Sequence, residues 1–293
     1  MLLIAGGEQD PNLLALMEAA QRLAVDTVDA RIASMVSPDF YWDLSTGQHS
    51  YPQGITAALI RQDVFAALHD PRPDVSQRAA AWFTTMHGWL LTQPQIKRLN
   101  QHIQPIAFNK PAALYCAQQI GLQIPTTRIS NSRARLPLAQ ADQWIAKPVT
   151  GGGYCAGLDE AFSDVGQAYA AQPAIVQQRL VSPEMRLFII GDQAFAFELI
   201  SPSLDYRVSQ DATLRQMAAP QQEETLLRQL MSQFGMDFGA ADFKTDPHTG
   251  AWVFLELNTS PMFARFNQVS EGELCEQMVR TLGSVDVSVV VAP

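Results

Sequence analysis

Two short stretches near the end of the chain decide the fold, Ala241-Asp242-Phe243-Lys244 and Phe254-Leu255-Glu256-Leu257-Asn258. The turn-forming residues 246–250 separate them, which predicts a β-hairpin. Side chains two residues apart on a strand point to the same face. We therefore expect Glu256 and Asn258 to project together with Phe254 in phase, while Leu255 and Leu257 face the other side. The hairpin brings Asp242 alongside Glu256 and Asn258.

These three side chains offer two carboxylates and an amide oxygen, which are ligands suited to Mg²⁺. A metal ion held by Asp242, Glu256 and Asn258 would bridge phosphate oxygens and neutralise charge during transfer of a γ-phosphoryl group. The alternative is a hairpin whose polar face is simply in contact with water. Flanking Phe, Leu and Trp residues make a purely solvated face unusual.

A lysine followed by a glycine loop is the second signal, formed by Lys147 and Gly151-Gly152-Gly153. A lysine at a strand end can neutralise a phosphate of ATP, and glycines let backbone N–H groups approach phosphate oxygens closely. The pattern is not a Walker A loop, because the lysine precedes the glycines. The alternative interpretation is a flexible β-turn.

The third signal follows the next predicted strand, residues 174–180. Its end reads Gln177-Gln178-Arg179-Leu180, and Glu184 and Arg186 come next. A strand edge offers backbone groups to an adenine ring, and Glu184 could take ribose hydroxyls. The alternative for Glu184 and Arg186 is a surface ion pair. Arg207, in a long loop, suits phosphate or carboxylate recognition, although an ordinary loop charge is the alternative.

The remaining pattern predicts an α/β segment followed by an α+β body. Residues 2–5 read as a buried strand, and Gly6-Gly7 is interpreted as a turn into a helix over residues 11–23 rather than as a dinucleotide site. Further helices are expected at 109–121, 221–234 and 273–282. Hairpins are expected over 186–200 and 238–258. A core face is expected at Trp82, Phe83, Trp89 and Leu90.

Composition limits the function further. The 293 residues carry a net charge of −9, are 47% hydrophobic and 17% charged, and include only three cysteines. An acidic chain disfavours a nucleic-acid partner. No apolar run approaches the roughly 20 residues that span a bilayer, so no membrane partner is expected. The odd number of cysteines fits a reducing cytoplasm. The apolar stretch 285–291 is interpreted either as an interface strand of a homodimer or as a core edge strand.

The order of these signals resembles the ATP-grasp superfamily, and within it the branch that holds the glutamate ligases extending a ribosomal protein tail and the microviridin-type (graspetide) peptide ligases. The resemblance covers about residues 99–267. The order runs Lys110, Lys147, Gly-Gly-Gly, Gln-Gln-x-Leu, Glu-x-Arg, Asp-x-Arg, Asp and Glu-x-Asn. Residues 100–131 are similar to the peptide ligases, whereas Asn258-Thr259-Ser260-Pro261 is closer to the glutamate ligases.

The resemblance implies a role for each residue. Lys110 and Lys147 would contact ATP phosphates, and Gly151, Gly152 and Gly153 would close over them. The adenine would be framed by Gln177, Gln178 and Leu180, and the ribose held by Glu184. Mg²⁺, with Mn²⁺ as an alternative, would be bound by Asp242, Glu256 and Asn258. The acyl phosphate or the acceptor would be held by Arg186 and Arg207.

The resemblance also implies three parts: an N-terminal pre-ATP-grasp α/β domain at 1–105, a central lid subdomain with the glycine loop at 106–178, and a C-terminal subdomain with the metal site at 179–293. The implied activity is ADP-forming C–N or C–O ligation through an acyl phosphate, on a ribosomal precursor peptide. One alternative is an amino-acid or protein-tail glutamate-type ligase. Another is a non-catalytic ATP-binding module, which the complete Asp242, Glu256 and Asn258 set argues against.

Overall fold

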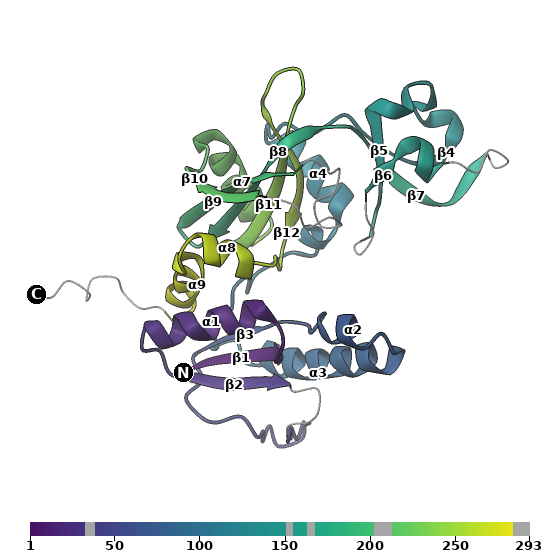
Figure 1. Ribbon diagram of the computed structural model, residues 1–293. Helices are drawn as coiled ribbons and strands as arrows, with labels where there is room; N and C mark the ends of the chain where they lie inside the picture. The colour runs from purple at the N-terminus through teal and green to yellow at the C-terminus, as the bar shows by residue number, and fades with distance from the viewer. Residues whose placement is uncertain (33–38, 151–154, 163–167, 202–212, 284–293) are drawn as a thin grey trace, which may run out of the picture. The chain divides into compact units, whose positions relative to one another are not determined.

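The computed structural model describes residues 1–32, 39–150, 155–162, 168–201 and 213–283. The chain divides into two compact units (Figure 1). The first unit joins Met1–Gln101 to the chain from Met262 onward, and the second is the continuous segment His102–Pro261. The sequence analysis expected the residues after Met262 in a C-terminal domain, whereas they group here with the start of the chain. The predicted stretch 285–291 lies outside the described residues.

The first unit is built on a three-stranded parallel sheet. Its strands lie in the order β2 (Thr27–Ile32), β1 (Leu2–Gly7) and β3 (Ala57–Ile60). Every residue of β1 is buried, as expected for the central strand of a parallel sheet covered on both faces. The helices of this unit are α1 (Pro11–Arg22), α2 (Ala66–His69), α3 (Pro73–Leu91), α8 (Ala264–Val269) and α9 (Glu273–Gly283).

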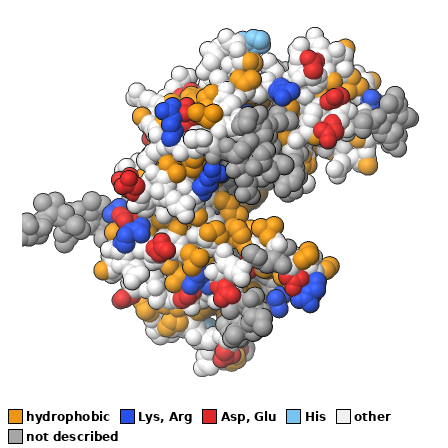
Figure 2. All heavy atoms as spheres, viewed as in Figure 1, with side chains coloured by type: hydrophobic (Ala, Val, Ile, Leu, Met, Phe, Trp, Pro, Cys, Tyr) orange, Lys and Arg blue, Asp and Glu red, His pale blue; other side chains and the backbone are white. Residues whose placement is uncertain are grey.

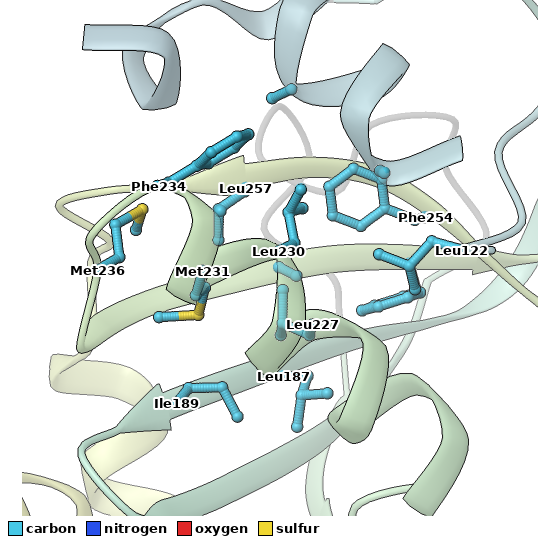
Figure 3. Close-up of a cluster of buried hydrophobic side chains, with 14 of the residues drawn as sticks. Leu122, Leu187, Ile189, Leu227, Leu230, Met231, Phe234, Met236, Phe254 and Leu257 are labelled. Atoms are coloured by element: carbon cyan, nitrogen blue, oxygen red, sulfur yellow. The ribbon is translucent and has the colours of Figure 1, made fainter. Parts of the chain in front are cut away.

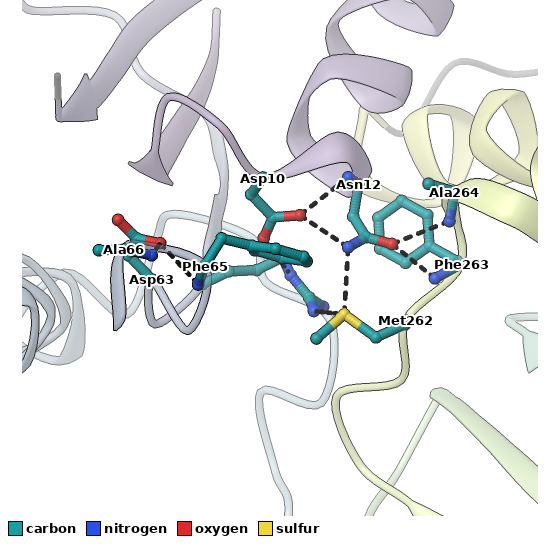
Figure 4. A network of polar contacts seen from close by, with 9 residues as sticks. Asp10, Asn12, Asp63, Phe65, Ala66, Met262, Phe263 and Ala264 are labelled. Atoms are coloured by element: carbon teal, nitrogen blue, oxygen red, sulfur yellow. Dashed lines mark hydrogen bonds and ion pairs between the residues drawn. The ribbon is translucent and has the colours of Figure 1, made fainter. Parts of the chain in front are cut away.

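Helix α1 begins where the sequence predicted a helix after the first strand. The Asp10 side chain accepts a hydrogen bond from the Asn12 N–H at 2.8 Å, and Pro11 occupies the first turn, where its missing N–H costs nothing. Asn12 in turn accepts hydrogen bonds from two backbone N–H groups at the start of α8 (Figure 4). The strand–turn–helix prediction is confirmed, whereas β2 was not predicted.

Helix α3 packs against one face of this sheet, but only some of the residues predicted to form its core face take part. Trp89 and Leu90 are buried against Leu3 of β1, as expected. Trp82 and Phe83 are only half-buried and line a cavity, so their assignment to the core was wrong. They lie closer to the start of the helix than the pair that packs on the sheet.

The second unit holds a five-stranded antiparallel sheet. Its strand order is β10 (Thr213–Met217), β9 (Gln193–Ile200), β8 (Val181–Ile190), β11 (Phe238–Thr245) and β12 (Trp252–Asn258). Both predicted hairpins are confirmed. Helices α4 (Lys110–Gln119) and α7 (Gln221–Gln233) contribute to its core.

Figure 3 shows how that core closes. Leu227, Leu230 and Met231 of α7 project toward Leu187 of β8 and Phe254 of β12. All five side chains are at most 1% exposed. Burying an apolar side chain of this size stabilises the fold by about 1.5–3 kcal/mol. Packing against α7 therefore holds one face of the sheet in place, and the polar residues of the same strands lie on the opposite face.

A smaller antiparallel sheet completes the second unit. Its order is β4 (Thr127–Ser132), β7 (Tyr169–Gln178), β5 (Trp144–Pro148) and β6 (Ala156–Gly157). A short helix α5 (Leu158–Ala161) and the 3₁₀ turns η1 (Pro105–Phe108), η2 (Arg133–Arg135) and η3 (Leu138–Gln143) complete the described elements. Phe162, Leu158 and Val176 belong to its separate core.

The surface shows no segregation of charge on the face drawn in Figure 2. Basic and acidic side chains of the described residues alternate there over both units. Within the part of the chain that the structure describes, no helix is long and apolar enough to cross a bilayer.

Candidate functional site

A cleft in the second unit collects most of the side chains that the sequence singled out. It lies between the two sheets of that unit, with strands β5 and β7 contributing from one and β8, β11 and β12 from the other. Its lining includes Lys147, Gln177, Gln178, Leu180, Glu184, Arg186, Asp242 and Glu256. Gly151, Gly152, Gly153 and Arg207 lie outside the described residues.

A row of charged side chains runs across three neighbouring strands. Arg186 of β8 is paired in register with Asp242 of β11, which is paired with Glu256 of β12. The Arg186 guanidinium donates two hydrogen bonds to the Asp242 carboxylate, Nε to Oδ1 at 2.6 Å and Nη2 to Oδ2 at 2.7 Å. Asn258 donates from Nδ2 to Asp242 Oδ2 at 3.1 Å. The predicted metal ligands therefore converge, with Asp242 at the centre.

Two lysines bring positive charge to the same row. Lys110, at the start of α4, places Nζ 2.8 Å from Glu256 Oε2. Burial lowers the pKa of Lys147, the neighbouring Lys110 lowers it further, and the carboxylate of Glu256 opposes both by raising it. An ammonium group that is partly desolvated and close to two carboxylates is poised to exchange its protein neighbours for phosphate oxygens.

A β-bulge corrects the predicted phase of strand β12. The register between β11 and β12 shifts after Asp242, so that Phe243 pairs with Phe254 and Leu255 is the extra residue. Phe254 is consequently buried in the core with Leu257, while Leu255 joins Glu256 in lining the cleft. The expectations that Phe254 would lie in phase with Glu256, and that Leu255 would face the opposite side from Glu256, were wrong. A strict period of two cannot show an inserted residue.

Five lining residues were not among the predicted site residues, namely Ile145, Cys155, Arg179, Lys244 and Leu255. Lys244 Nζ lies 3.0 Å from Glu184 Oε1, and the two residues are in register across β11 and β8. Lys244 could have been found, since it lies two residues beyond Asp242 on one strand and so shares its face. Ile145 stands in the same relation to Lys147. Only the bulge places Leu255.

The end of strand β7 offers unmet hydrogen-bonding capacity to the cleft. Gln177 is fully buried and donates from Nε2 to Thr127 Oγ1 at 3.0 Å, while its Oε1 has no hydrogen-bond partner among the described residues. An unpaired buried carbonyl oxygen costs free energy unless a donor such as an exocyclic amine reaches it. The buried side chain of Leu180 adds an apolar surface beside it.

The residues of the charged row fit a divalent magnesium ion. Two carboxylates and one amide on adjacent strands form a hard oxygen donor set. Within the described residues, no group of three or more His, Cys, Asp or Glu side chains gathers, so a thiolate or imidazole site of the zinc type is not formed there. The orphaned Gln177 oxygen and the partly desolvated Lys147 fit a nucleotide in the same cleft.

The two sheets, the cleft between them and the parallel N-terminal sheet define an ATP-grasp fold, as the sequence predicted. The ATP-grasp ligase PsnB, solved with a minimal precursor, is similar with a TM-score of 0.73 and 19% identity, over 96% of this chain and 99% of its own. A RiPP-associated ATP-grasp ligase of Chryseobacterium gregarium, solved with ADP and a leader and core peptide, has a TM-score of 0.75 and 17% identity, over 97% of both chains.

The macrocyclase MdnC from Microcystis aeruginosa MRC, bound with precursor peptide MdnA, has a TM-score of 0.71 and 18% identity, over 98% of this chain and 100% of its own. No protein-family model matches the chain, and no curated protein sequence matches it. The similarity is therefore one of fold, and it extends over both units.

Proposed function

We propose that the protein is an ATP-dependent, ADP-forming ligase that modifies a ribosomal precursor peptide by forming an amide or an ester. The observation that carries the proposal is the convergence of Arg186, Asp242, Glu256 and Lys110 in one row of charges, whose first three members line the cleft. The fold supports it, because the three similar structures are ligases or macrocyclases, each solved with a precursor or with leader and core peptides.

ATP would bind between the two sheets of the second unit. Gln177, Gln178 and Leu180 would frame the adenine, with the orphaned Gln177 oxygen accepting from its exocyclic amine. Glu184 would hold the ribose, and the ribose hydroxyls would replace Lys244 as the partner of its carboxylate. The phosphates would be held by Lys110, Lys147 and the glycine loop Gly151, Gly152 and Gly153. In this arrangement the γ-phosphate would face the charged row.

Asp242, Glu256 and Asn258 would hold Mg²⁺, or Mn²⁺ in its place. The metal would supply charge neutralisation at the phosphate oxygens during transfer. The same carboxylates are paired with Arg186 and Lys110, at 2.6 and 2.8 Å, so positive charge lies beside the proposed metal ligands.

The reaction would proceed in two balanced steps. A carboxylate oxygen of the donor attacks the γ-phosphorus, the bond from that phosphorus to the β–γ bridging oxygen breaks, and ADP leaves. The acceptor amine or hydroxyl then attacks the acyl carbon and loses its proton, and the C–O bond to phosphate breaks. Arg186 and Arg207 would stabilise the charge on the acyl phosphate or hold the acceptor. The protein supplies positioning and electrostatic stabilisation and no covalent nucleophile.

An alternative remains for the substrate. The Asn258-Thr259-Ser260-Pro261 sequence, which is similar to that of the glutamate-type ligases, favours an amino-acid or protein-tail substrate. The non-catalytic module is disfavoured by the intact Asp242, Glu256 and Asn258 set. The proposal also includes a cytoplasmic location and a homodimer, and sedimentation equilibrium would test the latter.

Trapping of the acyl phosphate tests this proposal directly. The protein is incubated with Mg-ATP, hydroxylamine and one of two donor pools, either free amino acids or peptides containing Glu and Asp, and hydroxamates are detected by mass spectrometry. Hydroxamate on peptides alone supports the peptide ligase. Hydroxamate on free amino acids supports the small-molecule alternative, and ATP binding without any hydroxamate would sink the claim of ligase activity.

Matched variants separate chemistry from folding. The double variant Asp242→Asn, Glu256→Gln keeps the shape of both side chains and should abolish hydroxamate formation. Glu223→Gln removes a carboxylate in the first turn of α7, outside the cleft, and should leave activity unchanged. Equal activity of the double variant and the Glu223 variant would show that the charged row has no catalytic role.

A further inference from the structure

A second cavity, of about 350 Å³, lies in the first unit and has no part in the site described above. It opens at the carboxyl edge of the parallel sheet. Gly6 and Glu8 line it at the end of β1, Ile32 at the end of β2, and Arg61 and Asp63 just after β3. Its position is thus set by where the three strands end.

The strand order makes this edge a favoured ligand position. From β1 the chain moves to β2 on one side, and later to β3 on the other, which gives the order β2-β1-β3. The chain reaches β3 from β2, so it crosses from one side of β1 to the other, and the strand order reverses between β1 and β3. The cavity is a crevice at the carboxyl ends of these strands. In open α/β sheets, ligands bind in such a crevice. Topology and cavity are independent observations that agree here.

One wall of the cavity is apolar and comes from helix α3. Val75, Ala79, Trp82, Phe83 and Met86 line it, and their spacing of four, three, one and three places them on one helical face. Trp82 and Phe83 are only half-buried, so both rings retain surface toward the cavity. The wall suits an aromatic or large aliphatic side chain.

The rim of the cavity carries three arginines in different states. Arg61 is buried and bound to Asp10 at 3.1 Å, and Arg72 is bound to Asp70 at 2.6 Å. Among the described residues Arg78 has no carboxylate within ion-pair distance, and it is exposed on α3 one turn before Trp82. Basic, acidic and hydrophobic side chains lie together where α3 begins (Figure 2). Arg78 is therefore available to a carboxylate of a ligand.

The same geometry argues against a nucleotide in this cavity. The start of helix α1, where a phosphate would bind in a dinucleotide site, is already capped by the buried carboxylate of Asp10 (Figure 4). Glu8 adds a second carboxylate on the loop that a phosphate would approach. The N-terminus of α1 is therefore already occupied, and a phosphate would meet the Glu8 carboxylate, whereas a ligand with an apolar group and a distant carboxylate avoids both.

We propose that this cavity binds a segment of the peptide substrate, with an aromatic or large aliphatic side chain against Trp82 and Phe83 and an adjacent carboxylate at Arg78. The inference rests on the proposed function, because that function supplies a peptide. It assigns to the first unit a share in substrate recognition, separate from the ATP cleft of the second unit.

The test uses the full chain labelled with 5-fluorotryptophan and observed by ¹⁹F NMR. Five tryptophans are present, and Trp82→Phe assigns the Trp82 resonance. The probe is N-acetyl-Phe-Glu-amide, which should shift the Trp82 resonance saturably. N-acetyl-Phe-Gln-amide and N-acetyl-Ala-Glu-amide should bind more weakly. Arg78→Gln should raise the Kd for the first probe about fivefold, a typical value for loss of one exposed ion pair.

Two further variants keep the inference falsifiable. Ala79→Leu fills the apolar wall without changing charge and should abolish the shift, and Arg22→Gln removes a positive charge on α1, away from the cavity, and should leave the Kd unchanged. No saturable shift, or an equal Kd for the Glu and Gln probes, overturns the inference. Hydroxamate formation on the same sample tells the two proposals apart. Hydroxamate formation without a Trp82 shift would contradict only the proposed binding in the cavity. A Trp82 shift without hydroxamate formation would contradict only the proposed ligase activity.

Discussion

Asp242 is the residue on which the candidate active site depends, because it is bound to both Arg186 and Asn258 and lies opposite Glu256. The side chains of Arg186 and Asp242 are 13% and 20% exposed, so water screens this ion pair only in part. A bidentate guanidinium contact fixes the orientation of both carboxylate oxygens. The row is thereby organised before any ligand binds.

Replacing Arg186 tests that organisation. We expect Arg186→Lys to lower kcat for ADP formation by about a hundredfold, since one ammonium group cannot reproduce two parallel hydrogen bonds and the loss of one donor to developing charge has effects of this size. Steady-state release of ADP, with hydroxylamine as acceptor, measures this. Arg215→Lys, an exposed pair with Glu198 on β10 and β9, is the control and should change nothing. Similar rates for both variants would contradict the role assigned to Arg186.

Lys147 shows how function opposes stability at a single residue. Burial lowers its pKa below the ordinary 10.5, so between the lowered value and 10.5 the unfolded chain binds more protons than the folded protein. Stability contributed by this residue therefore rises with pH across that window. Below the window the folded protein bears the full cost of the buried charge. We expect Lys147→Met to stabilise the protein at neutral pH by about 1 kcal/mol.

Urea unfolding of wild type and Lys147→Met at a series of pH values checks this expectation. The stability difference should shrink as the pH rises toward 10.5, because in this window the folded protein holds the lysine neutral and the cost of removing its proton on folding falls with pH. The variant should also lose affinity for ATP. A stability difference that is constant with pH would show that packing, and not charge burial, causes the effect.

At the scale of elements, helix α7 ends next to Gly235, whose backbone lies close to the backbone of His102. Gly235 has φ of +65°, and a Cβ there would lie 2.1 Å from the carbonyl oxygen of His102. Both the left-handed conformation and the contact require glycine. We expect Gly235→Ala to lower the free energy of unfolding by more than about 1 kcal/mol.

A second glycine gives the matched control. Gly88 lies inside helix α3, and a Cβ there meets no atom within 4 Å. Gly88→Ala should stabilise by about 0.5–1 kcal/mol through helix propensity alone. Thermal or urea unfolding of the two variants, compared with wild type, should give shifts of opposite sign. Shifts of the same sign would contradict the contact at His102.

Local pattern predicted most elements, and its failures have identifiable causes. The capped helix beginning after Asn109 and both hairpins follow from caps, turn residues and periodicity, which are all local. Strand β2 alternates polar residues with Val28, Ala30 and Ile32, which is a strand signal that was overlooked in the sequence. The bulge at Leu255 arises from pairing between strands, so no single strand encodes it. Convergence of Lys110 on Glu256 came from family resemblance and not from periodicity.

At the scale of the whole molecule, the first unit is assembled from two distant parts of the chain. Asn12 Oδ1 accepts hydrogen bonds from the N–H groups of Phe263 and Ala264 at 2.6 and 2.8 Å. Its Nδ2 and the guanidinium of Arg61 both approach the sulfur of Met262 at 3.2 Å. These contacts fasten the start of α8 to the start of α1 (Figure 4). No sequence motif signalled them, since they depend on residues about 250 positions apart.

We expect Asn12→Ala to lower the free energy of unfolding by about 2–4 kcal/mol, because it leaves two N–H groups without an acceptor where Asn12 itself is 1% exposed. Hydrogen exchange should accelerate in α8 and α9 and remain slow in β8 and β11. Asn109→Ala is the matched comparison, since Asn109 is an exposed cap that bonds a single N–H, and it should cost about 1 kcal/mol. Equal costs would show that the Asn12 contacts add nothing beyond an ordinary cap.

The divided first unit has a consequence for the order of events during protein synthesis. Because its helices α8 and α9 follow residue 261, the sheet of the first unit must wait on the ribosome for partners that are translated after the whole second unit. The second unit is continuous, so its contacts become complete once Pro261 has emerged. The sheet made before the second unit would then mature after it, and the surface of α1 that packs against α9 would remain open to chaperones in the meantime.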